Sequence, residues 1–160
     1  MGRGSTFTIY LPKVGTAAQV QDTVPSLAAT PRGSDTILLV EDEDLLRALI
    51  VSVLEESGYT VLAVGKPEEA LRVSEERPDP IRLLVTDVVM PGMNGRELAE
   101  RLTAERRTMK TLYMSGYTED TVIRHGVEHR QTAFLQKPFT PDVFLRKVRE
   151  ILDATTQQNG

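Results

Sequence analysis

Five charged or hydroxyl-bearing residues stand at the ends of apolar runs in the sequence. They are Glu41, Asp42, Asp87, Ser115 and Lys137. Carboxylates that lie close together repel one another, and they stay ionised together only when a cation joins them. Carboxylate oxygens around one small site suit Mg²⁺, which keeps several waters and favours a phosphate as a further ligand. If the fold brings these residues together, they indicate a Mg²⁺ site with phosphoryl chemistry beside it.

The candidate metal ligands are the three carboxylates and one main-chain group. We expect Asp42 and Asp87 to bind Mg²⁺ directly, whereas Glu41 would reach it directly or through a water molecule. The backbone carbonyl of Val89, just past Asp87, would complete the set.

Asp87 is also the candidate nucleophile, because a carboxylate can accept a phosphoryl group as an aspartyl-phosphate. Such a transfer needs positioning and neutralised charge more than covalent help from the protein. Lys137 would supply a positive charge to one phosphoryl oxygen and Ser115 a hydroxyl donor to another, while the metal takes the third.

Each of these residues alone has a structural explanation. Acidic residues at strand ends are often solvated turns, Ser115 could be an ordinary turn serine, and Lys137 could be a surface lysine. The occurrence of the whole set in register favours a site. His125 and His129 have the spacing of a metal-binding pair on a helix. Gly126 between them favours a helix end, so we expect no metal there.

The elements that must position these groups alternate between strand-like and helix-like patterns over residues 34–154. Short apolar runs predict strands, and apolar residues spaced three and four apart predict helices. Pro67 and the capping-box pair Asn94 and Glu97 mark helix starts, whereas Gly58 marks a helix end. Strands are predicted at 36–40, 59–64, 81–86, 111–114 and 133–136, and helices at 44–57, 67–77, 94–106, 118–125 and 141–152.

Strands alternating with helices predict an α/β fold, a doubly wound five-stranded parallel sheet with helices on both faces. Right-handed crossovers leave few topologies, and these units favour the flavodoxin-like strand order 2-1-3-4-5. Ligands of such sheets sit beyond the carboxyl ends of the strands, where the order reverses. The first, third, fourth and fifth strands are then spatial neighbours, which would bring the chemical residues to one edge of the sheet.

Composition narrows the classes of function. Of 160 residues, 40% are hydrophobic and 26% charged, the usual mix of a globular protein with one core. The formal net charge of −4, without a long basic run, predicts no nucleic-acid partner. Disulfides and thiolate metal sites are excluded because there is no cysteine. No apolar run approaches the roughly 20 residues that span a bilayer. We therefore expect no membrane contact and a cytoplasmic domain, although its parent protein could be membrane-anchored.

The motifs around these residues resemble the response-regulator receiver domain of two-component signalling. The resemblance covers residues 34–154 and rests on Leu-Leu-Val-Glu-Asp-Glu-Asp, Val-Thr-Asp-Val-Val-Met-Pro-Gly-Met-Asn-Gly, Tyr-Met-Ser-Gly-Tyr and Leu-Gln-Lys-Pro-Phe. It implies phosphoryl transfer from a phosphohistidine, dependence on Mg²⁺ and slow self-dephosphorylation, so that the domain catalyses reactions only on itself. It also implies an acidic pair at Glu41 and Asp42, a phosphoacceptor at Asp87, a switch hydroxyl at Ser115 and an invariant lysine at Lys137. Glu41 stands where aspartate is common.

The resemblance further implies a switch. Ser115 would move toward the phosphoryl group while an aromatic side chain turns inward, and Phe134 occupies that aromatic position. Phe134 lacks the hydroxyl of the commoner tyrosine, and it is equally well explained as part of the core. Val89 and Tyr117 flank the site, and both are bulky and cannot act as strong bases. We expect them to hinder the attacking water and to prolong the phosphorylated state.

The segment before the receiver pattern has two parts. Residues 1–13 contain Gly-Arg-Gly-Ser-Thr-Phe-Thr-Ile-Tyr-Leu-Pro, which resembles the end of a histidine-kinase ATP-binding domain, although a chance strand or an added tail would also explain it. We expect no stable fold there, because a lone strand has no partner for its backbone groups. Residues 14–33 have the composition of a flexible linker, and residues 155–160 that of a disordered tail.

Three hypotheses about function follow. In the first, the chain is the C-terminal receiver of a hybrid sensor histidine kinase, whose kinase core is the phosphodonor and whose phosphoryl group could pass to a histidine phosphotransfer protein. In the second, a stand-alone or degenerate receiver docks a partner without phosphorylation. The third is a phosphatase with an aspartyl nucleophile, which typically needs a second acid where this chain has Val89. The intact set of five residues favours the first.

Overall fold

A parallel sheet of five strands in the order β2-β1-β3-β4-β5 lies at the centre of the molecule. The computed structural model describes residues 33–116 and 132–154. The predicted α/β fold and strand order are confirmed. The strands are β1 (Thr36–Val40), β2 (Thr60–Val64), β3 (Ile81–Asp87), β4 (Lys110–Ser115) and β5 (Thr132–Gln136).

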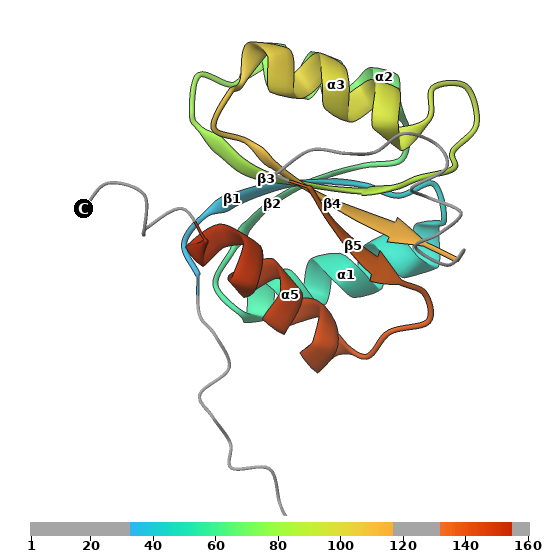
Figure 1. Ribbon diagram of the computed structural model, residues 1–160, viewed down its shortest axis with the longest axis vertical. Coiled ribbons are helices and arrows are strands. Elements are labelled where there is room, and N and C mark those ends of the chain that lie inside the picture. Colours follow the sequence, from blue (N-terminus) through green and yellow to red (C-terminus); the bar gives the residue numbers. More distant parts are fainter. Residues whose placement is uncertain (1–32, 117–131, 155–160) are drawn as a thin grey trace, which may run out of the picture.

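Helices cover both faces of this sheet, as Figure 1 shows. One face carries α1 (Asp44–Glu56) and α5 (Pro141–Asp153), and the other carries α2 (Pro67–Glu76) and α3 (Gly95–Glu105). All four lie within one or two residues of their predicted positions. The helix predicted at 118–125 lies outside the described residues, as do both histidines and the segments 1–32 and 155–160.

Local sequence signals account for where these helices begin and end. At the start of α3, Asn94 and Glu97 form the expected capping box, in which the Glu97 amide donates to Asn94 Oδ1 at 2.9 Å. Pro67 occupies the first turn of α2, and Thr140 caps α5. Gly58 follows α1 with a φ of +93°, a conformation that glycine adopts without the steric penalty of a side chain.

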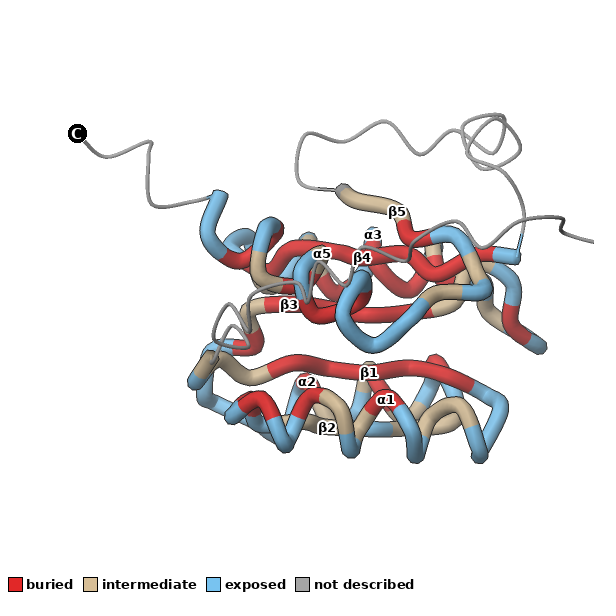
Figure 2. The backbone as a smooth tube through the Cα atoms, turned by 90° about the horizontal axis from the view of Figure 1, so that it is seen from below, coloured by how far each residue is buried: buried red, intermediate tan, exposed pale blue. Residues whose placement is uncertain are grey.

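Two apolar cores lie on opposite faces of the sheet. Figure 2 shows that β1, β3 and β4 are largely buried. Alternate residues of β1 point to opposite faces, so that Ile37 and Leu39 pack against α1 and α5 whereas Leu38 and Val40 pack on the other side. Each fully buried leucine or isoleucine contributes about 1.5–3 kcal/mol. Continuous apolar runs in β1 and β3 therefore fit strands that are covered on both faces.

Strand β4 begins one residue earlier than predicted, at Lys110. Lysine at a strand start reads as a polar boundary, yet this residue is only 8% exposed. Its Nζ donates to the carbonyl of Ile151, in the last turn of α5. The last carbonyls of a helix have no partner within the helix, so the ammonium group of Lys110 supplies one.

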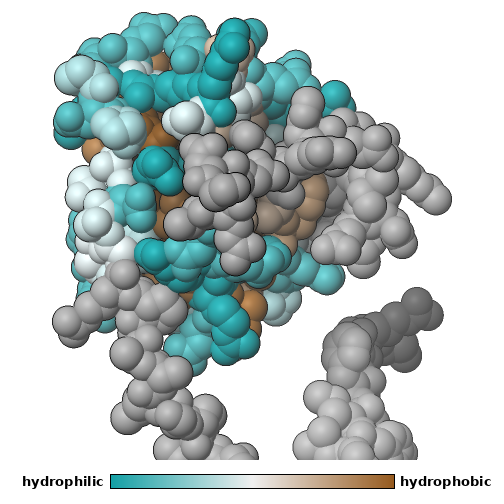
Figure 3. Space-filling view, turned by 60° about the vertical axis from the view of Figure 1, so that its left-hand side comes forward, coloured by the Kyte–Doolittle hydropathy of each residue, from teal (hydrophilic) through white to brown (hydrophobic). Residues whose placement is uncertain are grey.

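Hydrophilic residues dominate the described part of the face in Figure 3, and hydrophobic ones show only between them. Within residues 33–116 and 132–154, no helix combines the length and apolar character needed to cross a membrane.

Candidate functional site

Three carboxylates meet at the carboxyl ends of β1 and β3. Glu41 and Asp42 directly follow β1, and Asp87 is the last residue of β3. Each offers a carboxylate oxygen within 4.8 Å of the others, so the three could hold one cation between them. The strand order causes this convergence, because β1 and β3 are neighbours in the sheet although α1, β2 and α2 separate them in sequence.

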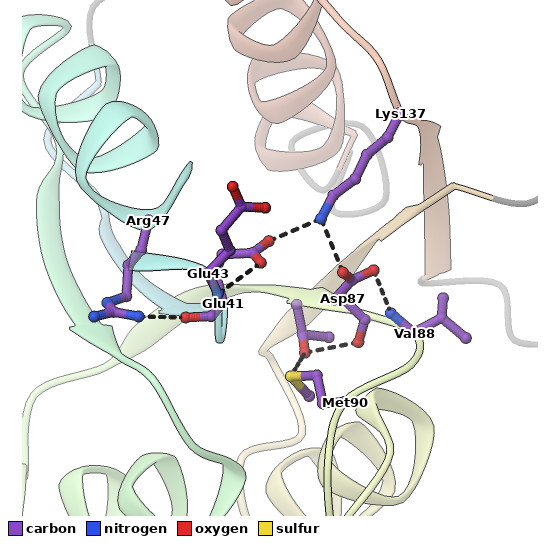
Figure 4. A network of polar contacts seen from close by, with 8 residues as sticks. Glu41, Glu43, Arg47, Asp87, Val88, Met90 and Lys137 are labelled. Atoms are coloured by element: carbon purple, nitrogen blue, oxygen red, sulfur yellow. Dashed lines mark hydrogen bonds and ion pairs between the residues drawn. The ribbon is translucent and has the colours of Figure 1, made fainter. Parts of the chain in front are cut away.

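Lys137 bridges two of these acids, as Figure 4 shows. It lies in the loop after β5, and its Nζ is 2.9 Å from Glu41 Oε2 and 2.8 Å from Asp87 Oδ2. Hydrogen bonds in which both groups are charged are among the stronger ones in proteins. The lysine therefore joins the ends of β1, β3 and β5 at one point.

The electrostatics of the cluster follow from its burial. Burial raises the pKa of Glu41, which is 1% exposed, although the hydrogen bond from Lys137 acts in the opposite direction. Burial alone would lower the pKa of Lys137, but its hydrogen bonds to Asp87 and Glu41 outweigh that effect and raise it. Lys137 is therefore a cation at neutral pH, and the one charge it brings leaves a cluster of three acids short of positive charge.

Asp87 is held by hydrogen bonds from both of its sequence neighbours. The Val88 amide donates to Asp87 Oδ1 at 3.0 Å, which turns the carboxylate toward the cluster. Thr86 is fully buried, and its hydroxyl donates to the Asp87 carbonyl at 3.1 Å. Val89, two positions past the aspartate, is 64% exposed.

The two candidate switch residues lie on neighbouring strands. Ser115 ends β4 and is buried, and its carbonyl accepts a hydrogen bond from the Lys137 amide at 2.7 Å. Phe134 pairs in register with Tyr113, and their rings stack with centroids 5.3 Å apart. Burial raises the pKa of Tyr113 to about 12, and Phe134 packs with it against the core under α2 and α3. Tyr117 lies outside the described residues.

Two residues of the site were not identified as such from the sequence. Gly95, the first residue of α3, packs so closely that an added Cβ would lie 2.0 Å from the Asp87 carbonyl oxygen. Arg47 of α1 donates from Nη1 to the main-chain carbonyl of Glu41 at 2.7 Å. The spacing of Gly95 from Asp87 within one motif was a usable signal for the glycine, whereas a contact between an arginine and a distant backbone carbonyl leaves no trace in sequence spacing.

Comparisons with known proteins place this chain in a family. The model of the response regulator receiver domain matches residues 37–149. The chain is 35% identical over 161 residues to the sensor kinase CckA of Brucella abortus, an alignment that covers 96% of this chain and 17% of the relative. It is 32% identical to the response regulator receiver protein CpdR of the same organism, over 74% of this chain and 97% of that protein.

A solved structure agrees with this placement. The receiver domain of the hybrid histidine kinase CckA is 33% identical, with a TM-score of 0.63 over 73% of this chain and 98% of that domain. The chain thus spans only 17% of the sensor kinase that it resembles but nearly all of an isolated receiver. It belongs to the response regulator receiver domain family of two-component signalling.

Proposed function

We propose that Asp87 accepts a phosphoryl group from a phosphohistidine in a reaction that depends on Mg²⁺. The observation that carries this proposal is the pairing of Lys137 Nζ with both Asp87 and Glu41, at 2.8 and 2.9 Å, beside the third acid, Asp42. A carboxylate next to a fixed cation and a set of metal ligands is the arrangement that phosphoryl transfer to an acid needs.

The residues present fit Mg²⁺, because three carboxylates within 4.8 Å supply hard oxygen ligands and excess negative charge. Glu41, Asp42 and Asp87 would hold the ion, and we propose the carbonyl of Val89 as a further ligand. When bound, the ion would neutralise charge on the phosphoryl oxygens. The same cation would also relieve the repulsion among the acids that Lys137 alone leaves partly uncompensated.

The chain's own groups would carry the transfer. An Asp87 carboxylate oxygen forms the new bond to phosphorus as the bond between phosphorus and the donor imidazole nitrogen breaks, and the electron pair of that bond returns to the imidazole. The ammonium group of Lys137 moves its hydrogen bond from the Asp87 carboxylate to a phosphoryl oxygen. The flexible side chain of lysine permits this movement. We infer that Ser115 then donates to another phosphoryl oxygen and that Phe134 changes its packing in response.

The proposed donor is the kinase core of a longer hybrid sensor kinase. The alignment with the sensor kinase CckA covers 96% of this chain, so it leaves out only about six of 160 residues and includes most of residues 1–32. The alignment with the receiver protein CpdR covers 74%. Likeness to a kinase over the part that precedes the receiver supports the hybrid architecture. A histidine phosphotransfer protein would be the next acceptor of the phosphoryl group.

We further propose that Val89 and Tyr117 prolong the phosphorylated state. Val89 is 64% exposed beside Asp87, where its apolar side chain would crowd a water molecule without activating it. Replacement of Val89 by a small or acidic residue should therefore shorten the lifetime of the phosphoryl group, which the loss of phosphorylated mass with time would measure.

The decisive experiment uses amide NMR shifts. Mg²⁺ and beryllofluoride, which together mimic a bound phosphoryl group, should shift the amides of Val88, Ser115 and Lys137 in the full chain. Asp87→Asn is the matched control, and its amides should stay unmoved by beryllofluoride. If saturating beryllofluoride leaves the wild-type shifts unchanged, the phosphoacceptor proposal fails and the chain is a receiver that docks a partner without phosphorylation. Turnover of exogenous phosphate esters would instead support a phosphatase.

A further inference from the structure

The guanidinium of Arg47 contacts Glu41, the first member of the acidic pair, on the side opposite Lys137. Nη1 donates to the main-chain carbonyl of Glu41 at 2.7 Å. Nη2 forms an ion pair with Asp44, which lies three residues earlier in the same helix. The side chain of Arg47 is 23% exposed, so this contact is partly shielded from water. Figure 4 shows Arg47 meeting Glu41 on the side away from Lys137 and Asp87.

Every polar group of Glu41 takes part in a hydrogen bond. Its amide donates to the Val64 carbonyl at 3.2 Å, Oε1 accepts from the Glu43 amide at 3.3 Å, and Oε2 accepts from Lys137. The bond from Arg47 holds the remaining group, the carbonyl. That carbonyl belongs to the peptide that links Glu41 to Asp42, and a planar peptide transmits the orientation of its oxygen to the next residue. Arg47 therefore acts on the position of both members of the acidic pair.

The guanidinium of Arg47 packs against the turn after β2, at Gly65. A Cβ added at Gly65 would lie 3.2 Å from Arg47 Nη1, which is tighter than an ordinary contact, and 3.6 Å from Cζ, which is an ordinary one. The arginine thus fills the space between the Glu41 carbonyl, the start of α1 and the turn at Gly65. Lysine could not replace it, because a single ammonium on a flexible stem lacks the two-pronged geometry that reaches the carbonyl and Asp44 together.

We propose that Arg47 is a positioning residue that sets how tightly the site binds a divalent cation. The inference rests on the proposed Mg²⁺ site. Groups that orient metal ligands commonly change metal affinity about 10–100-fold when they are removed. Arg47 orients Glu41 and Asp42 through their shared peptide, without being a ligand itself.

The sign of the effect separates positioning from simple electrostatics. If Arg47 acted only through its charge, its removal would strengthen Mg²⁺ binding, because a positive group near a cation site opposes binding. If it acts through the position of the acids, its removal weakens binding. A role confined to fold stability would lower the unfolding midpoint and leave the Mg²⁺ dissociation constant at 25 °C unchanged.

The test measures the Mg²⁺ dissociation constant of the full chain by isothermal titration calorimetry. We expect Arg47→Ala to raise it about tenfold and Arg47→Lys to rescue little of that loss. Gly65→Ala should cause a smaller increase in the same direction, because it displaces Nη1 by a few tenths of an ångström. Combined with Arg47→Ala it should add nothing, since the two changes act through one contact. Arg101→Ala, an exposed arginine of α3, is the control and should match the wild type.

The outcomes distinguish this inference from the function on which it rests. Wild-type binding of Mg²⁺ with equal or tighter binding by Arg47→Lys and Gly65→Ala would overturn the role of Arg47 and leave the metal site standing. Absence of Mg²⁺ binding by the wild type would overturn both. Urea unfolding in EDTA identifies a variant that is not folded, and the milder Gly65→Ala then carries the test.

Discussion

Two lysines lie at opposite ends of the central sheet, and they solve the problem of a buried charge in different ways. Lys137, after the carboxyl end of β5, pairs with the carboxylates of Glu41 and Asp87, which raise its pKa. Lys110, at the start of β4, donates to the Ile151 carbonyl, and burial lowers its pKa, with a further contribution from Arg82.

We expect this difference to separate the end of the sheet that takes part in the proposed phosphoryl transfer from the end that only stabilises the fold. In the proposed reaction an anionic phosphoryl oxygen replaces a carboxylate as the partner of Lys137, so the lysine would change partners without losing its charge compensation. The partner of Lys110 is a helix carbonyl that needs a donor whatever the state of the domain. We therefore expect substitutions at the first lysine to alter chemistry and those at the second to alter stability.

Lys137→Met should give the largest effect. Removal of one preorganised charged donor from a site of phosphoryl transfer slows the reaction about 10²–10³-fold, so labelling of Asp87 by acetyl phosphate should fall by at least that order. Intact-mass spectrometry over time measures it. Lys147→Met, at a lysine of α5 that pairs with Glu150, is the control and should react like the wild type. Unchanged labelling of Lys137→Met would contradict a role of Lys137 in the transfer reaction.

Lys110→Met should act on stability instead. It keeps the apolar stem but leaves the Ile151 carbonyl without its ammonium donor, which lowers the free energy of unfolding by about 1–3 kcal/mol. Urea unfolding measures this change, and acetyl phosphate labelling should stay within about twofold of the wild-type rate. A strong loss of labelling in a folded Lys110→Met variant would show that the two ends of the sheet are coupled.

The two lysines should also give stability opposite dependences on pH. The pKa of Lys110 is lower in the folded chain than in the unfolded chain. Below and up to an unfolded pKa of about 10.4, the unfolded chain therefore binds more protons than the folded one, and the stability of the wild type relative to Lys110→Met rises with pH. The folded pKa of Lys137 is raised, so its stabilisation is fully present below about 10.4 and is lost as pH rises through the folded value. Urea midpoints of wild type and variants between pH 8 and 11, compared at each pH, test both signs.

The smallest expected effect belongs to Asp153→Asn. The carboxylate of Asp153 lies close enough to Lys110 to favour its charged form, but it is 53% exposed and pairs with Arg149. Exposed pairs contribute about 0–1 kcal/mol, so the unfolding free energy should change by less than that of Lys110→Met. If the two variants are equally destabilised, Asp153 is a counter-ion of Lys110. Both lysines would then be stabilised by a carboxylate.

The strand-end residues could be predicted because the topology follows from the pattern. Apolar runs such as β1 alternate with helical periodicity, and parallel strands bring their carboxyl ends to one edge. Glu41 and Asp87 therefore had to approach each other, whatever their separation along the chain. Helix starts at Pro67 and Asn94 could be located for a different reason, since their capping chemistry is local.

Contacts that depend on three-dimensional packing could not be predicted. The predicted strand begins at residue 111 and leaves Lys110 outside it, and only the position of α5 shows which carbonyl this lysine reaches. The role of Lys137 as a partner of Glu41 as well as Asp87 was missed for the same reason, since sequence reasoning assigned it only to a phosphoryl oxygen. Arg47 binds a main-chain group, which any residue carries, so its partner has no signature in the sequence.

The close packing of Gly95 on Asp87 has a mechanical consequence. With no room for even a methyl group between the first residue of α3 and the Asp87 carbonyl, and with the Gly95 amide bonded to the Val88 carbonyl at 3.0 Å, nothing compliant separates the helix from the end of β3. A side chain at such a junction could absorb a small displacement by changing its rotamer, whereas two main chains in contact must move together. We therefore expect any displacement of the end of β3 to be passed directly to the first turn of α3.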